Sequence, residues 1–542
     1  MEIAKLLVAN RGEIAARIFR TCERLGIATV AVAAPDDRGA LHTRRAGEVL
    51  EIASYLDPEE LARAGKRSGA DAVHPGYGFL AENAAFAEAV EAAGLVWVGP
   101  PPEALRAAGN KLEARRTAAA AGVLVLASGP PEIVGYPLIV KAAGGGGGRG
   151  MRIVRSPAEL EPALGAARRE AKAGFGDDTV FLERYLERPR HVEIQLLADR
   201  AGAVVHLGER ECSIQRRHQK VLEESPSPAV DHVLREQMGT AAIAIARAVG
   251  YAGAGTAEFL LDGHEFAFLE LNARIQVEHP VTELLTGIDL VEQQLRIAAG
   301  ERLDLRFEPR GHVVEARLYA EHPVSLLPQA GRIERLELPD GVRVDTGVEP
   351  GDEVPIAYDP LIAKLVAHGE SREEAFERLS RALRETDVGG VTTNLPFLRW
   401  LVDHPEVRAG RTSTAFLDDH PPLSRPRPVP AAWGGYWRLN HDPDAAPPPP
   451  QSPPSLDAAA QAGGHEGAGG SLIAPMPGTI IRVLTREGDP VELRQPLVVL
   501  EAMKMETPLV SPYEAVVRRL HVSEGDRVAG GALLVELDQR PG

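Results

Sequence analysis

Two strand-like segments carry side chains that could bind a divalent metal ion. Glu258 lies in the first segment, Glu270 and Asn272 lie in the second, and Gly263 provides a turn between them. In a hairpin, the alternation of side chains can place all three on one face. Three oxygen donors beside a triphosphate suit Mg²⁺, which takes few protein ligands and completes its octahedron with phosphates and waters. A solvated acidic hairpin is the alternative interpretation.

The residues that follow could handle a small anion. Arg274, Gln276 and Glu278 alternate along the chain, so a strand would place them on a common side next to the proposed metal. A guanidinium could hold bicarbonate while a neighbouring carboxylate removes its proton. Upstream, residues 209–220 are dense in hydrogen-bond donors, unlike a core strand, and a solvated charge run is the alternative there.

A run of glycines could bind phosphate. Lys141 precedes five consecutive glycines at 144–148, and Arg149 and Arg152 follow them. Glycine lets backbone N–H groups approach an anion closely and leaves the loop free to move. No Gly-Lys-Ser/Thr follows, so this is not a Walker A loop. A flexible linker is the alternative, but the flanking cations favour a mobile lid that closes over ATP.

A further segment, residues 181–186, could contact a purine base. Glu183 and backbone groups near Leu186 would then read the edge of the base. Alone, this segment would be an unremarkable strand end. His191, which follows shortly after, could equally be a structural histidine.

The last part of the chain contains an internal repeat around one lysine. Residues 474–480 are echoed by 510–516, 487–489 by 524–526, and 497–500 by 533–536. Two similar runs of short strands predict a two-fold β-sandwich, with the segment between them as a hairpin turn at one end. Lys504 lies in that segment between Met503 and Met505, so its amine would face solvent and other proteins. An ordinary exposed lysine is the alternative.

This part of the chain resembles a biotinyl carrier domain. In such domains the lysine of an Ala-Met-Lys-Met motif is biotinylated, and here that lysine is Lys504. A lipoyl domain shares the architecture but usually has Asp-Lys-Ala at the turn. The resemblance therefore implies biotin.

The elements that must position the other groups begin with alternating strand-like and helix-like patterns. Apolar runs at 3–9, 28–34, 70–73 and 96–98 predict strands, and residues 13–25 have helical periodicity. This alternation predicts a parallel sheet with helical crossovers. The first turn lacks G-x-G-x-x-G, so a dinucleotide-binding dehydrogenase is only weakly supported.

Composition narrows the class of protein. The 542 residues are 44% hydrophobic and 25% charged, which excludes a disordered or collagen-like chain. A net charge of -17 argues against nucleic acid as the main partner. The two cysteines allow no disulfide framework and fit a reducing compartment. The start of the chain lacks signal-peptide features, and no apolar run approaches the ~20 residues of a membrane span. We therefore expect a cytoplasmic protein without membrane contact.

Taken together, the segments before the linker resemble biotin carboxylase, of the ATP-grasp superfamily. The match runs from about residue 5 to 416, through 9–15, 74–79, the glycine run and 272–280. The resemblance implies α/β and α+β folds followed by an all-β sandwich. The implied divisions are a Rossmann-like N-terminal domain (1–110), an ATP-grasp domain with a mobile lid (111–311), a biotin carboxylase C-terminal domain (312–420), a Pro/Gly-rich linker (421–470) and a biotinyl, lipoyl-like carrier domain (471–542).

The resemblance also implies roles for individual residues. The ATP-phosphate lysines would be Lys111 and Lys141, and the phosphate loop would contain Gly147 and Gly148. The nucleotide contacts would be Glu183, Leu186, His191, Gln215 and His218. The metal ligands would be Glu258, Glu270 and Asn272. The bicarbonate contacts would be Lys220, Gln276, Val277 and Glu278, with Glu278 as the base. Arg274 would be the catalytic arginine, and Arg343 would steady the biotin enolate.

The implied activity is that of an acyl-CoA carboxylase α subunit, which uses ATP, bicarbonate and Mg²⁺ or Mn²⁺ to carboxylate biotin on Lys504. The implied partners are a carboxyltransferase β subunit, through which acyl-CoA is reached, and biotin protein ligase. The carboxylase part would be a homodimer within a larger hetero-oligomer. Two alternatives stay open: the biotin carboxylase subunit of a pyruvate-type carboxylase, and a carrier protein whose ATP-grasp region is an inactive scaffold.

Overall fold

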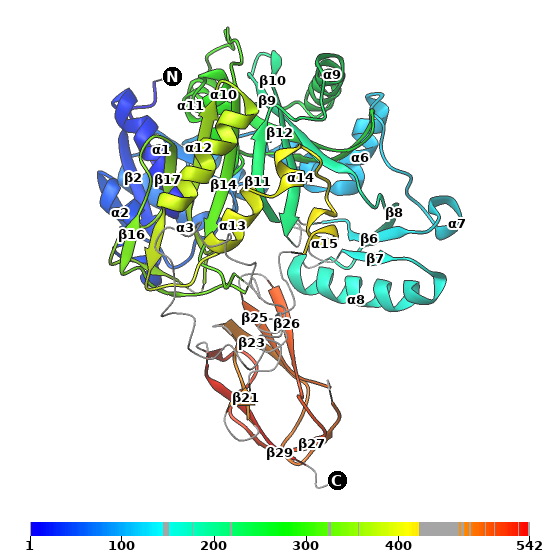
Figure 1. The fold of residues 1–542 in the computed structure, drawn as a ribbon. Helices are drawn as coiled ribbons and strands as arrows, with labels where there is room; N and C mark the ends of the chain where they lie inside the picture. Colours follow the sequence, from blue (N-terminus) through cyan, green and yellow to red (C-terminus); the bar gives the residue numbers. More distant parts are fainter. Residues whose placement is uncertain are drawn as a thin grey trace, which may run out of the picture.

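In the computed structural model, the N-terminal part of the chain forms a five-stranded parallel sheet (Figure 1). The structure describes residues 2–144, 151–175, 177–216, 219–323, 327–355, 357–421, 466–467, 471–475, 478–493, 495–502, 505–528 and 531–539. The sheet has the order β3-β2-β1-β4-β5, from β1 (Lys5–Val8), β2 (Ala28–Ala33), β3 (Glu48–Glu51), β4 (Ala72–His74) and β5 (Val96–Trp97). The predicted parallel sheet with crossovers is confirmed. The apolar runs did not predict β3, because this edge strand begins and ends with glutamate.

Helices follow the strands of this sheet and complete its crossovers. They are α1 (Gly12–Leu25), the 3₁₀ turn η1 (Pro35–Asp37), α2 (Leu41–Arg45), α3 (Pro58–Ser68), α4 (Ala84–Ala92) and α5 (Pro102–Gly109). The predicted helix over residues 13–25 is therefore present as α1. It ends at Gly26, which has a φ of 70°, a left-handed conformation that glycine adopts without steric cost.

An eight-stranded antiparallel sheet forms the centre of the molecule (Figure 1). Its order is β13-β12-β9-β10-β11-β14-β19-β17. The strands are β9 (Arg190–Ala198), β10 (Val204–Arg216), β11 (Gln219–Ser225), β12 (Gly253–Asp262), β13 (Glu265–Asn272), β14 (His312–Tyr319), β17 (Arg343–Thr346) and β19 (Leu361–Gly369). Since β11 pairs with β14, the sheet runs without interruption across residues 311 and 312, where the sequence suggests a change of domain.

Helices cover this central sheet. They are α6 (Lys111–Ala120), α9 (His232–Ala248), α10 (His279–Thr286), α11 (Leu290–Ala298), α12 (Arg372–Glu385), α13 (Leu395–Val402), α14 (Pro405–Arg408) and α15 (Phe416–Asp419). Two small ladders, β15 (Gly331–Arg332) with β18 (Glu353–Val354) and β16 (Arg335–Glu337) with β20 (Asp387–Gly389), lie beside it. Helix α10 packs against β10, β11, β14 and β19, so its first turn lies over the middle of the sheet.

A small antiparallel sheet carries the lid segment. Strands β7 (Arg152–Val154), β6 (Leu138–Ala142) and β8 (Val180–Arg184) pair in that order. Helix α8 (Pro157–Phe175) packs on β6 and β7, and α7 (Pro131–Val134) contacts β8. Lys141 lies near the end of β6, directly before the glycine run, of which Gly147 and Gly148 lie outside the described residues.

Two β-sheets form the C-terminal part, which confirms the predicted β-sandwich (Figure 1). One contains β21 (Glu466–Gly467), β22 (Ser471–Ile473), β29 (Leu533–Gln539), β27 (Ala515–Leu520) and β24 (Pro490–Val491). The other contains β26 (Met505–Val510), β25 (Pro496–Ala502), β23 (Gly478–Val483) and β28 (Arg527–Val528). Lys504 follows β25 and precedes β26, and it lies outside the described residues, as does most of the predicted linker. Within the described ranges, no helix is long and apolar enough to cross a membrane.

Candidate active site

The hairpin of β12 and β13 brings the predicted metal ligands together. Glu258 lies directly opposite Glu270, and Asn272 lies opposite Thr256, two positions along the ladder. The two carboxylates and the amide therefore share one face, as the alternation predicts. The Lys111 ammonium lies 3.6 Å from the Glu270 carboxylate. This oxygen-only donor set beside a lysine fits Mg²⁺ and a polyphosphate.

Lys220, at the start of β11, is the centre of the site. Its Nζ lies 2.5 Å from Glu193, 2.8 Å from Glu258 and 2.7 Å from Glu278. Burial alone would lower the pKa of this ammonium, but the three carboxylates hold it well above the usual range. Lys220 is therefore a permanent positive charge between the predicted metal ligands and the predicted base.

Glu278 stands at the N-terminal end of α10 and is almost completely buried. Burial would raise the pKa of its carboxyl group, but Lys220, Arg317 and Arg210 together lower it. One oxygen accepts a hydrogen bond from Lys220, and the other accepts one from Arg317 at 2.9 Å. The group is thus held as a carboxylate, the form that a base requires.

The backbone of residues 273–278 has a different conformation from the one that the sequence suggests. They form turns and bends rather than a strand, so the predicted alternation is wrong. Contacts fix the side chains instead. Gln276 donates to Glu258 at 2.9 Å and accepts from Arg210 at 3.0 Å. Arg274 donates to Asn272 at 3.1 Å and to Glu82 at 3.2 Å, and the Val277 carbonyl accepts from Lys364.

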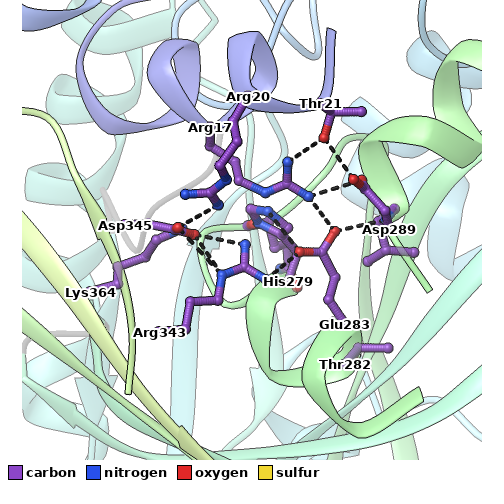
Figure 2. Close-up of polar contacts among 12 residues, drawn as sticks. Arg17, Arg20, Thr21, His279, Thr282, Glu283, Asp289, Arg343, Asp345 and Lys364 are labelled. Carbon is purple, nitrogen blue, oxygen red and sulfur yellow. Dashed lines mark hydrogen bonds and ion pairs between the residues drawn. The ribbon is translucent and has the colours of Figure 1, made fainter. Parts of the chain in front are cut away.

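Arg343, which the resemblance expects to steady the biotin enolate, lies outside this set of contacts. It lies on the edge strand β17 and pairs with Glu283 at 2.7 Å and with Asp345 at 2.8 Å (Figure 2). Arg317, on β14 next to β11, is the arginine that contacts Glu278. The physical reason is the strand order, since β19 separates β17 from β14. Figure 2 shows that the Arg343 cluster continues to Arg17, which contacts Glu283.

The nucleotide side of the site contains a buried ion-pair group. Glu183 contacts both Lys141 and Arg115. Its carboxylate is therefore held in place by these cations, and Leu186 nearby is half-buried. Burial lowers the pKa of Lys141, although Glu183 opposes this effect.

His191 lies between the nucleotide side and the metal hairpin. Its Nε2 is 2.9 Å from the Glu258 carboxylate, and its Nδ1 is 2.6 Å from the Gln215 amide. The histidine therefore contacts a predicted metal ligand as well as a predicted nucleotide contact. His218, another predicted nucleotide contact, lies outside the described residues.

Arg210 and Glu193 hold the site together, and sequence reasoning assigned neither a role. Both side chains are fully buried, and the guanidinium lies 2.5 Å from the carboxylate. Arg210 also donates to Gln195 and Thr282. The available signal was charge next to the apolar residues of strand-like segments. The same signal marks Arg317, within His312–Tyr319, where every residue is buried.

We expect Arg210→Met to destabilise the protein by about 3–5 kcal/mol, because it leaves the Glu193 carboxylate buried without its main partner. The free energy of unfolding in urea measures the loss. Arg24→Met is the control, because Arg24 pairs with Asp289 while half exposed, and such pairs contribute about 0–1 kcal/mol. Equal losses in the two variants would contradict a structural role for the buried pair.

Comparison with known proteins gives the family. Four family models match: "Biotin carboxylase, N-terminal domain" over residues 2–105, "Carbamoyl-phosphate synthase L chain, ATP binding domain" over 126–306, "Biotin carboxylase C-terminal domain" over 315–419, and "Biotin-requiring enzyme" over 470–537. The biotin carboxylase of Halalkalibacterium halodurans is 46% identical over 440 residues, which cover 77% of this chain and 97% of that protein. The chain belongs to the biotin carboxylase family.

Two further relatives extend this comparison. The α subunit of mouse mitochondrial methylcrotonoyl-CoA carboxylase is 45% identical over 444 residues, or 77% of this carboxylase and 62% of that subunit. The biotin carboxylase domain dimer of Hydrogenobacter thermophilus 2-oxoglutarate carboxylase, solved with MgADP, ADP and bicarbonate, has a TM-score of 0.76 and 40% identity. That match covers 78% of this chain and 98% of the solved one. This chain is therefore a ligase-type carboxylase of the ATP-grasp family, with a biotinyl domain after its carboxylase part.

Proposed function

We propose that this chain carboxylates biotin carried on Lys504, with ATP and bicarbonate as substrates, as the α subunit of an acyl-CoA carboxylase. One observation carries the proposal: Lys220 contacts Glu258 of the metal hairpin and Glu278 at the same time. A single positive charge thus lies between a metal site and a carboxylate base. A bicarbonate anion held by Lys220 is placed to lose its proton to Glu278 and to attack the terminal phosphate of ATP, which releases ADP.

The roles of the residues follow from these contacts. Lys111 and Lys141 bind the phosphates of ATP, and Arg274 and Lys220 hold bicarbonate while Glu278 accepts its proton. Glu258, Glu270 and Asn272 would hold Mg²⁺ or Mn²⁺, which when bound neutralises charge on the phosphates. Biotin, when attached to Lys504, supplies the nitrogen that receives the carboxyl group. Arg317 presents its positive charge beside the base, as its contact with Glu278 supports.

Bicarbonate-dependent release of ADP in the presence of free biotin tests this proposal. The full-length protein should release ADP only when ATP, Mg²⁺ and bicarbonate are all present, and added free biotin should increase the release. Removal of Mg²⁺ with EDTA should stop the release, and added Mg²⁺ should restore it. A carrier protein with an inactive ATP-grasp scaffold would release no ADP under any of these conditions.

The final acceptor and the partners belong to the same proposal. The similarity to a methylcrotonoyl-CoA carboxylase α subunit supports an acyl-CoA acceptor, reached through a carboxyltransferase β subunit. The similarity to a 2-oxoglutarate carboxylase domain supports the pyruvate-type alternative. Co-purification of the partner, followed by a panel of acyl-CoA and 2-oxo acid acceptors, separates the two.

The assembly and the location are also proposed. A homodimer of the carboxylase part is supported by the dimeric H. thermophilus domain. Biotinylation of Lys504 requires biotin protein ligase. The two free and buried cysteines, Cys22 and Cys212, support a reducing compartment such as the cytoplasm.

We expect Arg317→Lys to lower kcat for carboxylation of free biotin by about 10²-fold, because lysine cannot bridge Glu278 and Glu223 as a planar guanidinium does. Arg343→Lys should cause a much smaller loss, since Arg343 contacts Glu283 and Asp345 instead. Steady-state kinetics of both variants measure the difference. A larger loss of kcat in Arg343→Lys than in Arg317→Lys would indicate that Arg343 is the more important residue for catalysis.

A further inference from the structure

Two glutamates face each other in the middle of the central sheet. Glu223 on β11 lies directly opposite Glu315 on β14 in the antiparallel register. Both side chains are completely buried. Two residues that lie directly opposite each other have their Cβ atoms about 4.5–5.5 Å apart on the same face, and two negative charges in such a pair repel each other.

Hydrogen bonding does not relieve this repulsion. Both carboxylate oxygens of Glu315 lack a hydrogen-bond partner among the described residues. Glu223 contacts the Arg317 guanidinium as an ion pair. Two buried carboxylates close together cannot both ionise readily, so one proton held between them replaces repulsion with a hydrogen bond.

Charged groups from four elements act on the pair. Glu223 faces Arg317, Glu278 and Lys220, and Glu315 faces Lys364, Arg317 and Glu278. These groups come from β14, α10, β11 and β19, and the His279 imidazole on α10 is turned instead to the Gln276 carbonyl. Burial raises the pKa of Glu223 and that of Glu315, although Arg317 and Lys364 oppose this effect.

Arg317 connects this pair to the base. Its guanidinium contacts Glu223 of the pair and also donates a hydrogen bond to Glu278 at 2.9 Å. The position of the guanidinium therefore depends on the balance of negative charge on its two sides. A change of one charge in the pair therefore alters the attraction on the Arg317 guanidinium, although the pair is not proposed to bind substrate.

We propose that Glu223 and Glu315 share one proton and that this pair is a positioning device, which keeps Arg317 balanced between the pair and Glu278. The inference rests on the proposed function of Glu278 and Arg317 and adds two residues that contact neither substrate nor base. With the proton present, the pair carries one negative charge. When the proton leaves, the pair carries two and draws Arg317 away from Glu278. Activity must then fall as the pH rises through this ionisation.

Two substitutions test the role of each glutamate of the pair separately. Glu315→Gln imitates the protonated member, because a carboxamide is neutral, has nearly the same shape and can donate to Glu223. It should keep kcat for free biotin within about threefold at the lower pH and lose the alkaline decline. Glu223→Gln removes the ion-pair partner of Arg317. It should lower kcat by about 10²-fold, as expected for misplacement of a catalytic group, with less than about threefold change in KM for ATP.

Glu224→Gln is the matched control. Glu224 is the next residue on β11, but it pairs with His312 and Arg372 instead of Arg317. The control should lower the melting temperature and leave the pH profile of kcat unchanged. The pair has no such role if Glu315→Gln keeps the wild-type alkaline decline, or if Glu223→Gln matches Glu224→Gln in kcat.

Infrared difference spectra of the unmodified full-length protein test the shared proton without any variant and without turnover. A protonated buried carboxyl group should give a carbonyl band that disappears as the pH rises through the alkaline decline. The absence of such a band would overturn the proposal even if the variants fail to fold. A protein that shows the band but never carboxylates biotin would instead contradict the proposed function.

Discussion

Lys504→Arg is expected to abolish labelling by streptavidin and to abolish carboxylation of the acyl acceptor. The substitution keeps the positive charge, but a guanidinium cannot form the amide bond to biotin. Lys504 is the only lysine between residues 471 and 542, so no neighbouring amine in the carrier domain can replace it. Carboxylation of free biotin should continue, because none of the carboxylase residues changes.

The two readouts make this experiment decisive. A blot with streptavidin reports the attachment, and the free-biotin assay reports the carboxylase part in the same preparation. A persistent streptavidin signal in the variant would refute the assignment of Lys504 as the carrier residue. Loss of the free-biotin reaction would show that the substitution damages the carboxylase part as well.

Glu278→Gln is expected to lower bicarbonate-dependent ATP cleavage by about 10²–10⁴-fold, the usual loss for a general base. The carboxamide cannot accept a proton, yet it keeps the size of the side chain between Lys220 and Arg317. KM for ATP should change little, because Glu278 contacts no residue proposed to bind the phosphates of ATP. The initial rate of ADP release at saturating bicarbonate measures the loss.

Glu283→Gln is the matched control for this variant. Glu283 lies on the same helix, α10, but pairs with Arg17 and Arg343 (Figure 2). It should reduce stability and leave ADP release within a few-fold of the unmodified protein. If Glu278→Gln were equally active, a different group would have to take the proton from bicarbonate.

Local patterns predicted the hairpin of β12 and β13 correctly. Glu258, Glu270 and Asn272 come together because a tight turn and regular pairing from Thr256 to Glu258 determine their faces, although the ladder is irregular directly after Glu258. The alternation assumed for Arg274 to Glu278 failed, because that segment is a loop whose side chains are fixed by distant partners. The contact of Glu183 with Arg115 likewise joins residues 68 positions apart and could not be predicted from a short stretch of sequence.

Strand order explains why Arg317, and not Arg343, contacts Glu278. Each arginine lies in a short strand, and nothing within either strand says which one will pair next to β11. The strand order depends on which buried strands pair with each other over long sequence separations. The charged residues inside His312–Tyr319 were nevertheless a usable signal, because a buried arginine in a strand requires partners.

The uninterrupted pairing of β11 with β14 has a consequence for how the carboxylase part unfolds and how it can be divided. Its backbone amides should exchange with deuterium as one cooperative unit from β13 to β17, without a separate step near residue 311. A fragment that ends before β14 would leave β11 as an open edge with Val221 and Leu222 beside unpaired backbone groups. Such an edge invites pairing between molecules, so that fragment should aggregate.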